Sequence, residues 1–181
     1  GRRLIVLPAR DAGAQEVFQA AGPDATSIQG AVDAFRLKLG GLNTTLPALT
    51  SGRREINWDG GNPCVDVTTT PVTPFHVFLN ARGARFTTPG VGLTQAPTQG
   101  GPQGGLAVLF GQPSYGTIFA TFSAQRLFSP VGSRITDGFF FVPGTAGLPG
   151  GPVEAVSTGF GAVFTDVDEP NGEKGAGRHS T

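Results

Sequence analysis

Residues 153–168 read VEAVSTGFGAVFTDVD, an apolar run that ends in the two carboxylates of Asp166 and Asp168. β-branched and aromatic residues dominate its second half, and Gly159 and Gly161 allow a bulge or a close backbone approach. This pattern predicts a β-strand over 153–168. We expect the rest of the chain to fold around it.

The two carboxylates at the end of this run are candidate metal ligands. In an extended strand, Asp166 and Asp168 project from the same side, roughly 6.5 Å apart at Cα, so both are able to approach one calcium ion. The alternative is a pair of solvent-facing residues that precede a turn at 170–172. The fixed ligand spacing of a calcium-binding loop is absent from the sequence, which favours this alternative.

Length and composition favour one mainly β domain. The chain has 181 residues, enough for a single core but small for two. Gly and Pro number 29 and 15, which indicates many turns, and the 14 Phe supply apolar area that can offset the entropy of the chain. Lys and Arg together number 13, as do Asp and Glu, and no basic run is present. This balance argues against nucleic acid as a partner.

One segment has helical periodicity. Apolar side chains recur at helical spacing at Ile28, Val32, Phe35 and Leu39. They predict one helix over about 26–39, with its apolar face against the sheet. Thr26 and Gln29 have the spacing of a capping box at its start, and Gly40 follows as a stop signal.

The stretch GRREINWDGG, 52–61, alternates polar and apolar residues and predicts a strand with two different faces. Ile56 and Trp58 are expected to face the core, and Glu55 and Asp59 the other side. Trp58 is also a candidate stacking surface for a sugar ring, although a core position is the commoner role of a tryptophan.

The candidate site residues are carboxylates. The metal ligands proposed for calcium are Asp166, Asp168, Asp59 and Glu55. The single cysteine, Cys64, excludes an intramolecular disulfide and a zinc site with several cysteines. No catalytic residue is assigned, because no nucleophile motif is present. No apolar run of 18 residues or more occurs, so no transmembrane segment is predicted.

Shorter patterns complete the predicted organisation. Short strands are predicted at 4–7, 84–88, 117–122 and 134–144, with a β-like start at 106–110. The stretch 90–105, rich in Gly, Pro, Gln and Thr, is expected to be a flexible loop. We divide the chain into an N-terminal extension (1–23), a single β-sandwich domain (24–169) and a disordered polar tail (170–181).

Several long motifs occur between Asp24 and Asp168: DAFRLKLGGLN, GRREINWDGG, RFTTPGVG, IFATFSAQRLFSPVGSRITDGFFFVPGT and GFGAVFTDVD. Together they resemble a family of poorly characterised secreted or cell-surface bacterial proteins. The resemblance implies a signal peptide upstream, an extracytoplasmic location and a jelly-roll-like β-sandwich similar to lectin or carbohydrate-binding modules. It also implies further strands after TDVD, so that this chain resembles the N-terminal part of such a protein.

Three functions are compatible with these patterns. The first is a secreted or cell-surface module with a non-catalytic binding or structural role, whose ligand is a carbohydrate or surface polymer and whose fold calcium stabilises. The second is a carbohydrate-active hydrolase or lyase, which needs two of the carboxylates about 5–10 Å apart. The third is a structural component of an extracellular assembly.

A strand at 153–168 that no further strand follows is expected to leave an open sheet edge. A second copy or a partner chain is able to cover this edge. Alternatively, the apolar run at 4–7 folds back onto it. Pro8 limits how far that run extends as a strand, which favours assembly.

Overall fold

The computed structural model describes residues 2–7, 16–46, 50–59, 70–101, 104–123 and 125–166. Its helices are α1 (Ala25–Leu39), α2 (Leu79–Arg82), α3 (Gly105–Leu109) and α4 (Tyr115–Ile118). Its strands are β1 (Arg2–Leu7), β2 (Ala21–Gly22), β3 (Ala84–Thr87), β4 (Gly92–Ala96), β5 (Leu127–Val131), β6 (Asp137–Phe140) and β7 (Phe160–Phe164).

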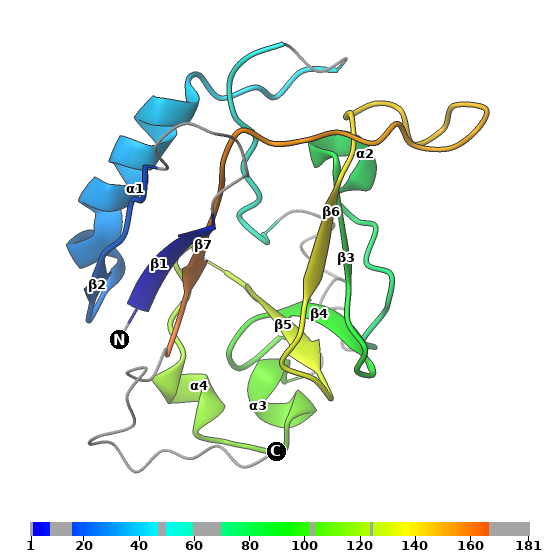
Figure 1. Cartoon of the computed structure of the whole chain (residues 1–181). Helices are drawn as coiled ribbons and strands as arrows, with labels where there is room; N and C mark the ends of the chain where they lie inside the picture. The colour runs from blue at the N-terminus through cyan, green and yellow to red at the C-terminus, as the bar shows by residue number, and fades with distance from the viewer. Residues whose placement is uncertain are drawn as a thin grey trace.

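The strands of the described residues form three small antiparallel sheets, ordered β2-β1-β7, β3-β6 and β4-β5. In Figure 1, β1 and β7 lie beside the long helix α1, and β3 and β6 run alongside each other on the other side of the molecule. Short strands in small antiparallel sheets, with one long helix, confirm the mainly β class that the sequence predicts.

β7 lies within the stretch 153–168. It pairs with β1 from Phe160 opposite Leu7 to Phe164 opposite Arg3. The N-terminal run therefore covers one edge of β7, the arrangement that the sequence had favoured less than assembly. Since β1 and β2 belong to the same sheet as β7, part of the range expected to be an N-terminal extension contributes strands to the fold.

Helix α1 confirms the helix predicted over 26–39, but its cap is different. Asp24 Oδ1 accepts the backbone N–H of Ser27 at 2.9 Å, and the backbone N of Asp24 lies 3.4 Å from Ser27 Oγ. The capping box predicted at Thr26 and Gln29 is wrong, because the extended backbone of Asp24 (φ −146°, ψ 177°) makes it the N-cap. Thr26 already belongs to the first turn.

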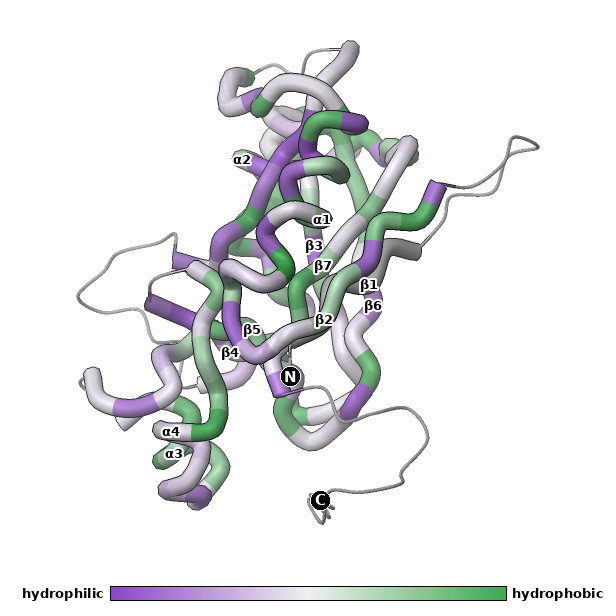
Figure 2. The backbone as a smooth tube through the Cα atoms, turned by 90° about the vertical axis from the view of Figure 1, so that its left-hand side faces the viewer, coloured by the Kyte–Doolittle hydropathy of each residue, from purple (hydrophilic) through white to green (hydrophobic). Residues whose placement is uncertain are grey.

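The apolar face of α1 packs on β7 through two glycines. Ile28 is fully buried. A Cβ added at Gly161 would lie 2.6 Å from Phe35 Cε1, and one at Gly159 would lie 2.9 Å from Leu39 Cδ2. The close approach that these glycines predict is therefore made by α1, which covers this face of the sheet. Figure 2 views the molecule from the helix side.

The other face of β7 turns toward the rest of the protein. The Phe160 ring lies 5.7 Å from the ring of Phe140 on β6, between centroids.

The main core cluster has Phe75, Phe78, Ala84, Phe86 and Leu93 at its centre and Ile56, Trp58 and Phe128 packed against it. Because this cluster joins β3, β4 and β5, the sheets β3-β6 and β4-β5 share one core.

β4 corrects the prediction that 90–105 is a flexible loop. All five of its residues are buried, and it pairs with β5 along its whole length. Gly92 has φ 157°, and a Cβ there would lie 2.5 Å from the backbone of Pro71 and Val72. The glycine that indicated flexibility is thus needed for close packing of two backbone segments.

Three other strand predictions are wrong. The β-like start at 106–110 and the alternating run at 117–122 lie largely in α3 and in the end of α4 with the coil after it, because a short apolar run fits a helical turn as well as a strand. Among the described residues of the stretch 52–61, which are 52–59, only Arg53 makes a β-bridge, to Leu42, and Trp58 has φ 65°, which interrupts an extended strand. The strands predicted at 4–7, 84–88 and 134–144 are confirmed by β1, β3 and β6.

Some predictions lie outside the described residues. These are the metal ligand Asp168, the cysteine Cys64 and the tail at 170–181. In the part of the chain that the structure describes, no helix is long and apolar enough to cross a membrane.

Candidate functional site

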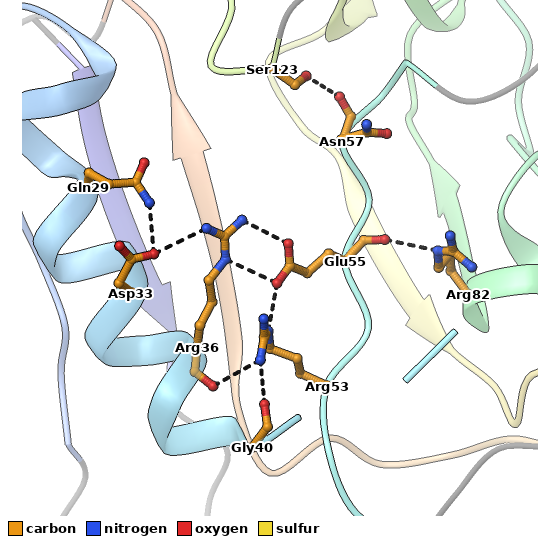
Figure 3. A network of polar contacts seen from close by, with 9 residues as sticks. All are labelled: Gln29, Asp33, Arg36, Gly40, Arg53, Glu55, Asn57, Arg82 and Ser123. Carbon is orange, nitrogen blue, oxygen red and sulfur yellow. Dashed lines mark hydrogen bonds and ion pairs between the residues drawn. The ribbon is translucent and has the colours of Figure 1, made fainter. Parts of the chain in front are cut away.

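Glu55 is the centre of a network of charged side chains (Figure 3). Its carboxylate accepts two hydrogen bonds from Arg36 of α1, from Nε at 3.0 Å and from Nη2 at 2.8 Å. Arg53 Nε donates a third, at 2.6 Å. Arg36 Nη1 also lies 3.3 Å from the Asp33 carboxylate. The predicted metal ligand Glu55 therefore joins α1 to the segment that follows it, through a bidentate ion pair.

The neighbouring arginines extend the network to backbone carbonyls. Arg53 Nη1 donates to the carbonyl of Gly40, at the C-terminal end of α1 (Figure 3). Arg54 donates to the carbonyls of Thr45, at 2.6 Å, and Ala81, at 2.9 Å. Carbonyls at the end of a helix lack partners within the helix, so these side chains satisfy acceptors and connect three segments.

The pairing fixes the charge state of Glu55. Burial raises the pKa of Glu55, but the hydrogen bonds and charges of Arg53 and Arg36 outweigh it and hold this pKa below its ordinary value. Burial lowers the pKa of Arg36, and its acidic partners reverse this, so the pKa is raised. Burial and the charge of Arg82, which donates to the Glu55 carbonyl at 2.9 Å, lower the pKa of Arg54. Glu55 is therefore ionised at neutral pH, with its oxygens occupied by guanidinium groups.

Asp59 connects its segment to the residues just before β5. Its Oδ1 accepts the backbone N–H groups of Gln125, at 3.2 Å, and Arg126, at 2.9 Å. Ser123 Oγ donates to the Asn57 carbonyl (Figure 3), and Asn57 Oδ1 accepts the backbone N–H of Asp59 at 3.3 Å. These polar groups position the chain that leads into β5.

Trp58 lies in the sequence between Glu55 and Asp59, and its side chain packs in the core. Its ring stacks on Phe128 with 4.1 Å between centroids and an angle of 4°, and meets Phe78 and Phe86 edge-on at 5.7 and 5.6 Å. A backbone with φ 65° is uncommon for so bulky a residue. The aromatic contacts stabilise this conformation, and they give Trp58 the core position that was the alternative to a sugar-stacking role.

Asp166 lies just beyond the end of β7. β7 ends at Phe164, and Asp166 has φ 52°, in the left-handed region. The strand alternation that was expected to place Asp166 and Asp168 on one side therefore stops before Asp166. Among the described residues, no group of three or more His, Cys, Asp or Glu is placed to hold a metal ion.

A third arrangement, which was not predicted from the sequence, lies on the β3-β6 sheet. Arg85 of β3 is opposite Phe139 of β6. Its guanidinium carbon lies 5.0 Å from the centroid of the Phe139 ring and 4.8 Å from that of Phe141. Phe139 is 42% exposed and Phe141 only 6%. This face therefore holds a cation over an aromatic surface that is partly open to solvent.

One signal for this arrangement was available in the sequence. Ala84 and Phe86 are buried, so the strand period places Arg85 on the opposite face. The approach of Phe139 depends instead on the pairing of β3 with β6, which no local pattern predicts.

The chain matches no protein-family model, no curated protein and no solved structure. The resemblance to secreted bacterial proteins therefore stays a prediction, and function is argued from the side chains described above.

Proposed function

We propose that this chain is a secreted or cell-surface module that binds a carbohydrate or another surface polymer without cleaving it. The observation that carries the proposal is the hydrogen bonding of two carboxylates. Glu55 accepts from arginine side chains, and Asp59 accepts from backbone amides. A glycoside hydrolase needs one carboxyl group as a proton donor and another as a base or nucleophile. An ionised Glu55 held by two arginines is unsuited to donating a proton.

The fold that accompanies this proposal is a jelly-roll-like β-sandwich. The resemblance to extracellular modules is the source of this assignment and of the extracellular location. Two observations support a layered arrangement: β7 lies between α1 and β6, and β3-β6 and β4-β5 share one core. In such a fold, the outer sheet faces are available as binding surfaces, and the outer face of β3-β6 carries the exposed Phe139.

Calcium stabilisation through Asp166 and Asp168 is part of the proposal. Of the other two predicted ligands, Glu55 has both carboxylate oxygens paired with arginines, and Asp59 accepts two backbone N–H groups through Oδ1. Melting in excess calcium and in chelator tests the proposal. A higher midpoint with calcium, lost in Asp166→Asn, supports the site by mass action, and equal midpoints contradict it.

A structural role in an extracellular assembly is the second candidate. β7 is the last strand in the order β2-β1-β7, and on its second edge it pairs with no strand in the described part of the chain. Backbone groups at such an edge are able to pair with another chain. Sedimentation over a range of micromolar concentrations tests this role: concentration-dependent dimers support it, and a monomer throughout contradicts it.

Binding and cleavage are separated by one experiment with two readouts. The protein is incubated with insoluble bacterial cell-wall polysaccharide, and co-sedimented protein and released reducing ends are both measured. We expect saturable co-sedimentation and no release above the buffer control. Release that Glu55→Gln abolishes would establish the hydrolase instead. Absence of co-sedimentation with any polysaccharide would contradict the binding function.

A further inference from the structure

Arg85 differs from Arg36, Arg53, Arg54 and Arg82. Each of these four donates hydrogen bonds to a carboxylate or a carbonyl. Arg85 contacts the rings of Phe139 and Phe141 and donates to no oxygen of the described residues. A guanidinium that is positioned by rings keeps its hydrogen-bonding capacity for a ligand.

The burial of Arg85 defines the direction from which a ligand approaches. Among its nitrogens, only Nε is buried without a hydrogen-bond partner in the described part of the chain. Nη1 and Nη2 are not buried in this way, so they are the groups able to donate to a ligand. Two parallel N–H groups at the end of a planar fork match the two oxygens of a carboxylate. The rings limit the motion of the fork before the ligand arrives, which reduces the entropy lost on binding.

The exposed part of Phe139 indicates what carries the carboxylate. Phe139 is opposite Arg85 in the β3-β6 pairing and remains 42% exposed. The C–H face of a pyranose ring is able to pack on this phenyl surface and remove it from water. In a uronic acid the carboxylate is attached directly to that ring, so one sugar residue reaches both the phenyl ring and the guanidinium. An acidic peptide side chain offers only methylene groups beside its carboxylate.

Asp137 restricts the charge of the ligand. It precedes Phe139 by two residues on β6, and it is exposed on the same face of the strand. Its negative charge disfavours a dense polyanion on this face. A polysaccharide with isolated uronic acids among neutral sugars avoids this repulsion.

We propose that Arg85 and Phe139 bind a single uronic acid residue of an acidic polysaccharide, with the carboxylate on Nη1 and Nη2 and the sugar ring on the phenyl face. This inference rests on the proposed binding function and assigns to it a site and a ligand class.

Calorimetric titration with two matched oligosaccharides tests the inference on the unaltered protein. One is aldotetraouronic acid, which is xylotriose with a single glucuronic acid branch, and the other is neutral xylotetraose. We expect binding of the acid to be tighter by about tenfold or more, since charge-assisted hydrogen bonds have this magnitude. Equal affinities would overturn the proposal. A glutamate-containing peptide that binds as tightly as the acid would also overturn it, in favour of a protein partner.

Three variants locate the site. Arg85→Gln is expected to reduce the affinity for aldotetraouronic acid to that for xylotetraose, and Arg85→Lys to restore it only in part, because lysine lacks the planar fork. The control is Arg134→Gln, which makes the same charge change at an exposed position and is expected to leave affinity unchanged. Circular dichroism confirms that each variant is folded. If the folded Arg85→Gln variant still binds aldotetraouronic acid as tightly as the unaltered protein does, Arg85 is excluded as the site.

The outcome for cell-wall polysaccharide separates this inference from the proposed function. Co-sedimentation that is the same for the unaltered protein and Arg85→Gln overturns the uronic acid site and leaves the binding function standing. Absence of co-sedimentation for the unaltered protein overturns both.

Discussion

The ring of Trp58 is covered on one face by Phe128 and contacted at its edges by Phe78 and Phe86. The residues on either side of it, Asn57 and Asp59, hold the segment before β5 through hydrogen bonds. A tryptophan between polar residues resembles a sugar-binding surface in sequence. At the scale of single residues, the ring contacts of Trp58 instead stabilise its left-handed backbone conformation in the core.

The fluorescence of Trp58 tests its core position, because it is the only tryptophan of the chain. We expect the native emission to be blue-shifted relative to tryptophan in water and to move to the red on unfolding in urea. Saccharide is expected to leave the native spectrum unchanged. A native spectrum like that of free tryptophan, or a change on addition of sugar, would show that the ring is a binding surface.

The stability provided by Glu55 should depend on pH. Its folded pKa lies below its ordinary value of 4.5, so its pairing with Arg36 and Arg53 stabilises the fold above pH 4.5 and is lost as the pH falls through the folded value. The side chain is 33% exposed, and screening by solvent limits the effect. We expect Glu55→Gln to lower the free energy of unfolding by about 1–2 kcal/mol at pH 7 and by progressively less in acid.

Urea unfolding at a series of pH values measures this difference. Glu154→Gln is the matched control, since Glu154 is exposed and has no ion pair among the described residues. A deficit in Glu55→Gln that persists undiminished at low pH would show that charge pairing is not its cause.

At the scale of elements, glycines separate what the sequence can predict from what it cannot. In α1, Gly30 interrupts a helical pattern, and a Cβ there meets nothing within 4 Å. In β4, a Cβ at Gly92 would meet the backbone of Pro71 and Val72 at 2.5 Å. Each glycine indicates flexibility when only its neighbours in the sequence are considered. The tertiary contacts show that Gly30 has open space and that Gly92 is closely packed.

Substitution of these two glycines by alanine should have opposite effects. Gly30→Ala is expected to raise the free energy of unfolding by about 0.5–1 kcal/mol, because alanine has the higher helix propensity and space is open. Gly92→Ala is expected to lower it by about 2–4 kcal/mol through backbone overlap and strain at positive φ. Thermal unfolding of both variants measures the contrast. Destabilisation by Gly30→Ala, or neutrality of Gly92→Ala, would contradict the described packing.

Local sequence patterns predict the elements that have apolar periodicity, capping residues or turn residues of their own. α1 has apolar periodicity and a following Gly40, which predict the helix and its end, while its N-cap, Asp24, was misassigned to Thr26. β3 and β6 have runs of β-prone residues closed by turns. β4 has no such signal, because it is buried by pairing with β5 and by Val72 rather than by its own composition.

At the scale of the whole molecule, two of the predicted site residues, Glu55 and Asp59, have roles in the architecture. Glu55 joins α1 to the segment that follows it, and Asp59 joins that segment to the residues just before β5. Their residue types were predictable as functional candidates, but their partners are distant in sequence. The outer face of β3-β6 was not predicted because Arg85 and Phe139 meet only through strand pairing.

The central claim is that Glu55 and Asp59 hold the fold and that binding occurs elsewhere. The double variant Glu55→Gln/Asp59→Ala tests it most directly, measured for both stability and co-sedimentation with cell-wall polysaccharide well below its melting temperature. We expect the free energy of unfolding to fall by about 2–4 kcal/mol, because hydrogen bonds to a charged carboxylate and to backbone amides are lost, while co-sedimentation is unchanged. A folded variant of unaltered stability that no longer binds would contradict the claim.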